Sequence, residues 1–310
     1  MKPPAVIFIA GPTAVGKSEA ALVLGPRLDA EIICCDAFQV YREINIASDK
    51  PSTQARSKVF HHLVDVLSVT EEFNAARWQK LCLAAIRDVR SRGKMPLIVG
   101  GSGMYMSVLL DGIFEEVPAG KDIKEELSRE LAAKGPAVLH ERLMALDPQA
   151  ASRIHPRDPQ RIIRALQVVQ STGKPISQLQ PRREGLWGKM PVAIFALNRP
   201  RQELYRRVDA RVEGMFAQGI VEEIQKVSRL PLSATARKLI GIPEVTGYLN
   251  GEYDLDRAKY LMKLHTRHYA KRQLTWFRGQ ERLRWIDIAA GQSAQDAAEI
   301  IARHIEDDQG

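Results

Sequence analysis

The chain has 310 residues, 45% of them hydrophobic, which is enough for one large domain or two smaller ones. Its net charge of +8 favours a polyanionic partner, with a general basic bias as the alternative. The three cysteines have no C-x-x-C spacing, which argues against a disulfide framework or a zinc site and indicates a cytoplasmic location. We expect neither a signal peptide nor a membrane span, because no apolar run approaches about 18 residues.

The first motif is a glycine-rich turn between an apolar run and a helical pattern. Residues 5–10 predict a buried strand and residues 19–24 a helix, and the turn between them reads Gly11-Pro12-Thr13-Ala14-Val15-Gly16-Lys17-Ser18. This is the P-loop pattern G-x-x-x-x-G-K-[ST] in the context that it requires. Its backbone N–H groups and the helix N-terminus suit phosphate oxygens, Lys17 adds charge, and Ser18 is a candidate Mg²⁺ ligand. The motif predicts a di- or triphosphate site, with a chance glycine-rich turn as the alternative.

Further strands are predicted at residues 31–35, 61–66 and 96–101, with a helix at residues 73–92. This alternation predicts an α/β fold with a parallel sheet. Asp36 follows the second strand and therefore lies at the same sheet edge as the P-loop, where ligands gather. A turn or helix-capping role for Asp36 is the alternative.

Residues 121–179 are charged and helical in pattern, with no convincing strand. We expect a helical insertion domain at residues 116–189 and an α/β core formed by residues 1–115 and 190–310. Within the insertion, Arg161 and Arg164 fall on one face of a predicted helix beside Gln160. This face is either a grip on nucleic acid or a solvated basic surface.

The sheet pattern resumes at residues 192–197, and a helix from Arg201 to Gly219 carries Arg207 and Arg211 one turn apart. A later helix, at residues 255–277, opens a strongly basic stretch. Between Arg257 and Arg284 there are nine Lys or Arg residues and one acid, interleaved with Tyr269, Trp276 and Phe277. Such a mixture suits RNA, with charge for the backbone and rings for stacking. The alternative is a packed helix that buries Trp276 and Phe277.

Several ordered motifs over nearly the whole chain resemble the tRNA dimethylallyltransferase (tRNA isopentenyltransferase) family, in its short bacterial form. They are the P-loop, Asp36-Ala37-Phe38-Gln39-Val40-Tyr41, Gly100-Gly101-Ser102-Gly103-Met104-Tyr105, Asp158-Pro159-Gln160-Arg161-Ile162-Ile163-Arg164-Ala165-Leu166 and Lys271-Arg272-Gln273-Leu274-Thr275-Trp276-Phe277-Arg278. The resemblance implies a P-loop kinase-like sheet flanked by helices. It also implies that the P-loop holds the diphosphate of dimethylallyl diphosphate while N6 of adenosine 37 of tRNA, flipped from the anticodon loop, attacks the allyl group.

The same resemblance assigns residues to that reaction. Asp36 matches the family's base, while Lys17, Thr13, Arg211 and a Mg²⁺ ion on Ser18 would stabilise the diphosphate. The implied contacts with tRNA are Asp36, Ala37, Phe38, Gln39, Ser102, Lys124, Gln160, Arg161, Ile162, Ile163, Arg164, Lys271, Arg272, Gln273, Trp276 and Arg278. We expect tRNA and dimethylallyl diphosphate as partners, and a monomer. The chain departs from the family at Asp49, an extra carboxylate near the phosphate site, and at Ile242-Pro243, which replace an aromatic and a basic residue.

Three other functions fit parts of the sequence. A P-loop small-molecule kinase would bind ATP, but it leaves the basic and aromatic segment 265–278 unexplained. An RNA-binding NTPase would change its RNA affinity with the nucleotide and make no modified product. A prenyltransferase acting on free adenine nucleotides would need neither the helical insertion nor the two basic segments.

Overall fold

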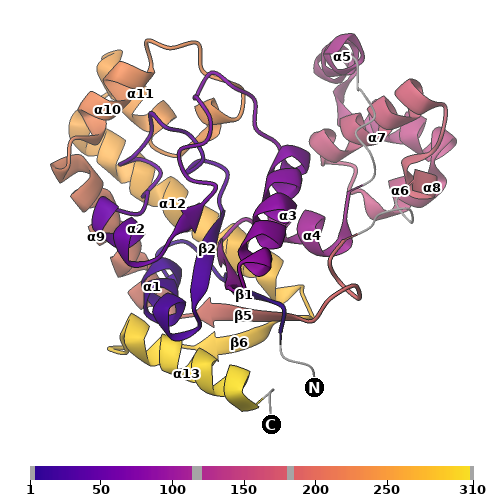
Figure 1. Ribbon diagram of the computed structural model, residues 1–310. Helices are drawn as coiled ribbons and strands as arrows, with labels where there is room; N and C mark the ends of the chain where they lie inside the picture. Colours follow the sequence, from indigo (N-terminus) through magenta and orange to yellow (C-terminus); the bar gives the residue numbers. More distant parts are fainter. Residues whose placement is uncertain (1–3, 114–120, 180–184, 308–310) are drawn as a thin grey trace. The chain divides into compact units, whose positions relative to one another are not determined.

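The computed structural model describes residues 4–113, 121–179 and 185–307 (Figure 1). The chain divides into two compact units: the sheet unit, residues 1–109 with 186–310, and the helical unit, residues 110–185. The expected domain boundary at residues 115 and 116 lies outside the described residues. Within the described ranges, no helix is both long enough and apolar enough to cross a membrane.

The sheet unit contains one six-stranded sheet in which every neighbouring pair of strands is parallel. Its strands, in the spatial order β3-β2-β4-β1-β5-β6, are His61–His62, Ala30–Cys35, Met95–Gly100, Val6–Ala10, Val192–Asn198 and Arg284–Asp287. All residues of β1 and β2 are buried, as expected for central strands covered on both faces. The predicted α/β fold with a parallel sheet is therefore confirmed.

Helices cover both faces of the sheet (Figure 1). Ile7 and Ile9 of β1 join an apolar cluster with Leu24 of one helix and Ile301 of another. On strand β2, the carbonyl oxygen of Cys34 accepts a hydrogen bond from the Trp78 indole at 3.0 Å. The helices are α1 Lys17–Arg27, α2 Thr53–Lys58, α3 Ala75–Ser91, α4 Gly103–Asp111, α9 Arg201–Ala217, α10 Ile220–Val227, α11 Ile242–Leu249, α12 Leu255–Arg278 and α13 Ala294–Asp307, with a 3₁₀ turn η2 at Ala236–Lys238.

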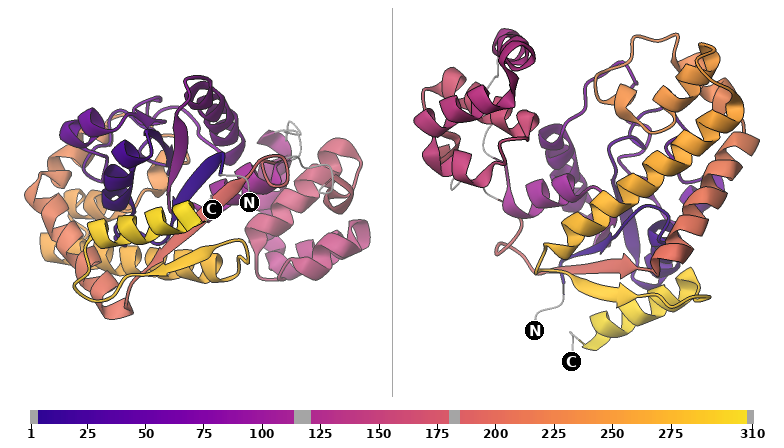
Figure 2. Two further views of the ribbon diagram at one scale, coloured as in Figure 1. Left: turned by 60° about the horizontal axis from the view of Figure 1, so that its bottom comes forward. Right: turned by 180° about the vertical axis from the view of Figure 1, so that it is seen from behind.

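Helix α12 is the longest helix of the sheet unit. Figure 2 (right view) shows it running from the sheet toward α11, and it packs against both α9 and α11. Ala270 and Phe277 are buried on its inner side, whereas Lys271 and Arg278 are exposed. The predicted basic segment is thus an amphipathic helix, with one side committed to packing.

The third strand is shorter than predicted. The sequence favoured a strand over residues 61–66, but β3 contains only His61 and His62. The backbone leaves the extended conformation because Leu63 and Asp65 have positive φ angles of 62° and 59°. The chain then runs beside the segment after β2, where the Asp65 amide donates to the Gln39 carbonyl oxygen at 3.3 Å.

The helical unit has a small apolar core of its own. Its helices are α5 Lys121–Leu146, α6 Pro148–Arg153, α7 Pro159–Thr172 and α8 Ile176–Leu179. Leu127 and Leu139 of α5 pack with Ile162 and Leu166 of α7, and all four are fully buried. Helix α7 begins where Asp158 caps the Arg161 amide at 3.1 Å and ends at Gly173, so the predicted basic segment lies in its first turn.

Glu31 is a buried carboxylate within β2 whose charge is compensated by basic neighbours. It accepts hydrogen bonds from Arg92 and, at 2.7 Å, from His62, and the Lys94 ammonium lies 3.4 Å away. The bond from Arg92 contributes most to lowering the pKa of Glu31 to about 2. This group stabilises the fold fully above about pH 4.5, and its contribution is lost as the pH falls toward 2.

We predict that Glu31→Gln lowers the free energy of unfolding by roughly 2 to 3 kcal/mol at pH 7, because it leaves Arg92 and Lys94 without their buried partner. Urea denaturation at pH 7 and between pH 5 and pH 3 measures this difference, which should shrink as the pH falls. Asp88→Asn is the matched control, since it removes an exposed carboxylate from the same arginine and should cost less than about 1 kcal/mol. Equal losses in the two variants would contradict the special role of Glu31.

Candidate active site

The P-loop joins the end of β1 to the start of α1 and has a backbone that suits phosphate binding. Gly11, Ala14 and Gly16 have positive φ angles of 138°, 63° and 109°. A Cβ at Gly11 would lie 2.7 Å from the Leu197 carbonyl oxygen, so a side chain there would collide with β5. The loop therefore turns tightly against the sheet and leads directly into the N-terminus of α1.

Two arginines from the segment after β5 support the loop from behind. Arg199 donates from Nε to the Val15 carbonyl oxygen at 2.9 Å and is buried. Arg207 donates from Nε to the Ala14 carbonyl oxygen at 2.7 Å. Because the N–H of a trans peptide points away from its carbonyl oxygen, binding of these two oxygens by arginines directs the N–H groups of the same peptides to the opposite side, where they can meet a phosphate.

Lys17, Thr13 and Arg211 gather on the phosphate side of the loop. The Lys17 ammonium donates to the Pro12 carbonyl oxygen at 2.7 Å, and Arg211 donates to Thr13 Oγ1 at 3.0 Å. Burial, followed by the nearby Arg211, lowers the pKa of Lys17 to about 8. The Arg211 guanidinium also lies 3.0 Å from the Asp49 carboxylate. Asp49, the carboxylate that departs from the family pattern, thus contacts an arginine that was predicted to bind the diphosphate.

Asp36 follows β2 and begins a tight turn. Its Oδ1 accepts hydrogen bonds from the amides of Phe38 at 2.8 Å and Gln39 at 3.3 Å. Asp36 therefore has the turn role that the sequence left open as an alternative, but that role uses only one of its two carboxylate oxygens, Oδ1. Burial raises the pKa of Asp36 above its usual value, while these two bonds and the charge of Lys17 oppose the rise. A carboxylate with a raised pKa beside a cation is a good candidate for a proton acceptor.

These groups open into one cavity of about 370 Å³ within the sheet unit. Thr13, Lys17, Asp36 and Arg211 line its polar side. A second part of the wall is apolar and consists of Val212, Met215, Leu239, Ile240 and Met262. The cavity therefore combines a phosphate cradle, a carboxylate and a hydrocarbon-lined wall, which suits a ligand with an anionic head and an apolar tail.

Helix α12 also reaches this site, through the side chain of Gln273. Gln273, expected among the tRNA contacts, is buried and accepts from the Thr13 amide at 2.8 Å. Its Nε2 donates to the Gly101 carbonyl oxygen at 2.8 Å. Trp276 is partly buried, and its ring lies so close to Gly103 that a Cβ there would approach it to 2.3 Å. Gln273 thus ties α12 to the P-loop and to the loop after β4.

The other predicted tRNA contacts differ in accessibility. In the sheet unit, Lys271, Arg272 and Arg278 are exposed, and Arg272 also lines the cavity. In the helical unit, Ile162 is fully buried in the core and Ile163 packs against that core. Side chains available to a polyanion there are Lys124, Gln160 and Arg161, which are exposed, and Arg164, which is partly exposed. Ser102 and the turn residues Ala37, Phe38 and Gln39 are also partly exposed.

The residues around the cavity fit a Mg²⁺ ion that is held mainly by a ligand. No group of three or more His, Cys, Asp or Glu side chains that could hold a metal occurs among the residues that the structure describes. Ser18 is exposed at the start of α1 and lines the cavity together with the carboxylates of Asp36 and Asp49. Mg²⁺ usually binds one or two protein oxygens together with substrate phosphates and water, so this donor set is sufficient.

Several residues that shape the site have no local sequence pattern that would reveal their role. Gln273 contacts a residue 260 positions away, and Arg199 contacts one 184 positions away. The position of Arg199 directly after β5 is a usable signal, because the carboxyl ends of parallel strands meet at one edge. Nothing comparable marks Glu223, whose carboxylate accepts from the amides of Ile46 and Ala47 at 2.9 Å.

The family model described as IPP transferase matches residues 39–280. The tRNA dimethylallyltransferase of Thermotoga maritima is 41% identical over 285 residues, covering 91% of this chain and 92% of the relative. The tRNA dimethylallyltransferase 1 of Trichlorobacter lovleyi is 42% identical and covers 91% of this chain and 93% of the relative.

Solved structures agree with these relatives. The full-length tRNA isopentenylpyrophosphate transferase of Bacillus halodurans is similar with a TM-score of 0.70 at 32% identity, covering 97% of each chain. A eukaryotic dimethylallyltransferase acting on tRNA is similar with a TM-score of 0.81 at 28% identity, covering 97% of this chain and 79% of that one. This chain therefore belongs to the IPP transferase family, whose relatives named above are tRNA-modifying transferases.

Proposed function

We propose that the protein transfers the dimethylallyl group of dimethylallyl diphosphate to N6 of adenosine 37 in tRNA, beside the anticodon, and releases diphosphate. The observation that carries this proposal is the shared cavity, into which Lys17, Arg211 and Asp36 all open. Its apolar wall suits the branched hydrocarbon of the donor. The family of the chain and the names of its relatives support the same activity.

In this reaction a bond forms between adenosine N6 and C1 of the allyl group while the bond between C1 and the diphosphate oxygen breaks. The proton that N6 loses goes to the Asp36 carboxylate, whose second oxygen has no part in the turn bonds of Oδ1. Lys17, Arg211 and Thr13 bind the diphosphate as negative charge builds on the departing oxygen. Because the P-loop holds this leaving group, its role here is binding and charge stabilisation without nucleotide hydrolysis.

A Mg²⁺ ion held by Ser18 and the diphosphate would supply further charge stabilisation when bound. Buried free thiols at Cys34, Cys35 and Cys82 suit a reducing compartment, and we place the reaction in the cytoplasm. We expect the protein to act on tRNA as a monomer. The exposed cations of α7 and α12 are the groups that we assign to the tRNA backbone.

The proposal is tested with an anticodon stem-loop RNA and dimethylallyl diphosphate labelled in the allyl group. We expect label to enter the RNA, and an otherwise identical stem-loop with guanosine at position 37 to stay unlabelled. Label in both RNAs would contradict the assigned acceptor. Transfer of phosphate from ATP to a small molecule, without labelled RNA, would instead establish the kinase alternative.

We predict that Arg161→Ala weakens tRNA binding and flattens its dependence on salt, because the Arg161 side chain is 72% exposed and held only by a surface ion pair with Asp158 at 3.4 Å. Each lost phosphate contact should reduce the slope of log affinity against log salt by about 0.7 to 0.9. Binding measured at several salt concentrations gives this slope. Arg90→Ala, an exposed arginine on α3 outside the expected contacts, should leave it unchanged. An unaltered slope in Arg161→Ala would show that this face of α7 is a solvated basic surface and does not bind tRNA.

A further inference from the structure

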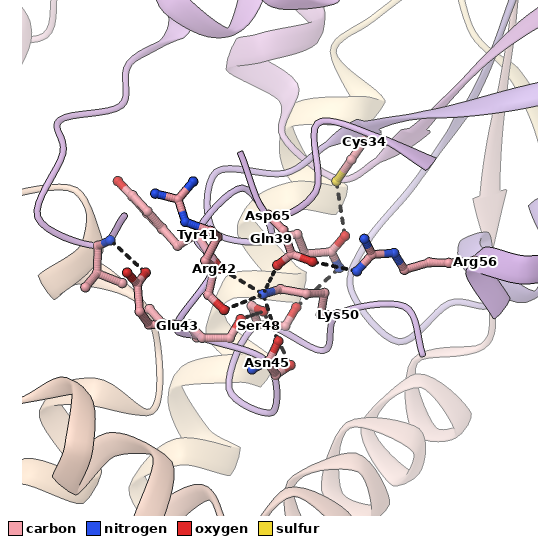
Figure 3. Close-up of polar contacts among 12 residues, drawn as sticks. Cys34, Gln39, Tyr41, Arg42, Glu43, Asn45, Ser48, Lys50, Arg56 and Asp65 are labelled. Atoms are coloured by element: carbon pink, nitrogen blue, oxygen red, sulfur yellow. Dashed lines mark hydrogen bonds and ion pairs between the residues drawn. The ribbon is translucent and has the colours of Figure 1, made fainter. Parts of the chain in front are cut away.

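The base-carrying segment, residues 36–50, is long and mostly without regular secondary structure, yet it is held by a dense set of polar contacts (Figure 3). It begins at Asp36, directly after β2, and ends at Lys50, one residue beyond Asp49. Its first residue, Asp36, and its last but one, Asp49, both line the cavity. The position of the carboxylate at Asp36 depends on what holds this segment.

Lys50 is the centre of these contacts. Its side chain is 4% exposed, and its ammonium group donates to the Tyr41 carbonyl oxygen at 2.7 Å, to Asn45 Oδ1 at 2.9 Å and to Asp65 Oδ1 at 2.6 Å (Figure 3). A fourth and longer contact reaches the Arg42 carbonyl oxygen at 3.4 Å, so the three donors of the ammonium group are all engaged. Lys50 is absent from the wall of the cavity that holds the P-loop lysine and Asp36. It lies beside the phosphate site, where a neighbouring hollow is lined by Lys50 together with Ser18 and Arg211. Its ammonium group is occupied by contacts within the chain itself.

Asp65 connects this centre to the neighbouring part of the chain. Its other oxygen pairs with Arg56 at 2.5 Å, and its amide donates to the Gln39 carbonyl oxygen at 3.3 Å. Asp65 has a positive φ of 59°, one of the two such angles that end β3 early. The irregular backbone after β3 thus places this carboxylate against Lys50, which explains a departure from the predicted strand.

Gln39 connects the end of the base-carrying segment to the turn that begins at Asp36. Its Nε2 donates to the carbonyl oxygens of Ser48 at 3.2 Å and Asp49 at 3.0 Å, and its Oε1 accepts from the Cys34 thiol at 3.1 Å (Figure 3). The Gln39 amide is also one of the two donors to Asp36. Gln39 therefore links the two parts of the segment, with its side chain on residues 48 and 49 and its backbone N–H on the Asp36 carboxylate.

We propose that Lys50, with Asp65 as its partner, is a positioning residue that fixes the turn of Asp36 and so the direction in which the base meets adenosine N6. This inference rests on the proposed role of Asp36 as the base. Lys50 does not touch the substrate in this account; it keeps the two ends of the base-carrying segment at a fixed separation across the cavity. Small misplacements of a catalytic group reduce the rate by large factors without abolishing ligand binding.

The test compares catalysis with phosphate binding in full-length Lys50→Met, which removes the ammonium group but retains an unbranched side chain. We expect kcat for prenyl transfer to fall about 100-fold. The affinity for pyrophosphate, measured by calorimetry, should stay within about threefold of wild type, because the P-loop and Arg211 remain. Lys50→Arg should recover part of kcat by restoring a charge opposite Asp65.

Two further variants decide between positioning and general support of the fold. Asp65→Asn should also lower kcat, by a smaller factor than Lys50→Met. This variant provides the test if Lys50→Met fails to fold. Lys94→Met, a lysine paired with Glu31 away from the cavity, should lower Tm and leave kcat unchanged. The proposal is overturned if Asp65→Asn and any folded Lys50 variant keep kcat within about threefold of wild type, or if pyrophosphate binding falls as far as kcat. Absence of product from the wild-type protein would instead reject the proposed function.

Discussion

Asp36→Asn is expected to reduce kcat for prenyl transfer by about 100-fold to 10,000-fold, because the substitution removes the proton acceptor while preserving its size. The asparagine oxygen can still accept from the amides of Phe38 and Gln39, so the turn should remain. Single-turnover rates at saturating donor and tRNA measure the chemical step. Binding of tRNA, measured separately, should stay within about threefold of wild type.

Asp49→Asn is the matched control for this experiment, because it neutralises another carboxylate of the same cavity. Its effect on the chemical rate should be much smaller than that of Asp36→Asn. In the wild-type protein, the rate should fall on the acid side as Asp36 becomes protonated. Since burial raises the pKa of Asp36, this loss should begin at a higher pH than for an exposed aspartate. Wild-type rates in Asp36→Asn would remove Asp36 from the mechanism.

Lys17→Met is expected to weaken pyrophosphate binding by about 10-fold to 100-fold and to lower kcat as well. A charge-assisted hydrogen bond to phosphate contributes on the order of 1.5 to 3 kcal/mol, and Lys17 is placed at the P-loop to make one. Because the pKa of Lys17 is about 8, its ammonium form declines as the pH rises through that value. Wild-type affinity for pyrophosphate should therefore fall between pH 7 and pH 9.

Calorimetric titration with pyrophosphate across this pH range measures both effects. The Lys17→Met protein should lose the decline that the lysine causes. Lys226→Met, which changes an exposed lysine on α10, should bind like wild type at every pH. Full pyrophosphate affinity in Lys17→Met would contradict the assignment of the P-loop as the diphosphate cradle.

The sequence predicted those parts of the site that depend on local pattern. The P-loop was recognisable because its glycines, lysine and serine are contiguous and lie between a strand and a helix. The place of Asp36 followed from the rule that the carboxyl ends of parallel strands share one edge, and it lines the same cavity as Lys17. Recognising the P-loop and placing Asp36 each require only one strand and the segment that follows it.

Contacts between distant segments could not be predicted in this way. The side chain of Gln273 lies in a basic, aromatic stretch that favours RNA binding, but it faces inward and bonds to Thr13. Lys50 and Asp65 are ordinary loop residues in the sequence, and only the early end of β3 brings them together. A strand prediction from apolar residues alone also missed the positive φ angles at Leu63 and Asp65.

We propose that the P-loop of this protein serves prenyl transfer to tRNA. The most direct test of this proposal is one incubation of the protein with unmodified tRNA, dimethylallyl diphosphate and Mg²⁺ in the absence of ATP, followed by digestion and mass spectrometry of the nucleosides. We predict a new adenosine derivative that is heavier by one dimethylallyl group. The proposal would be contradicted if the adenosine stayed unmodified without ATP, and if prenylated adenosine or transferred phosphate were found only after ATP was added.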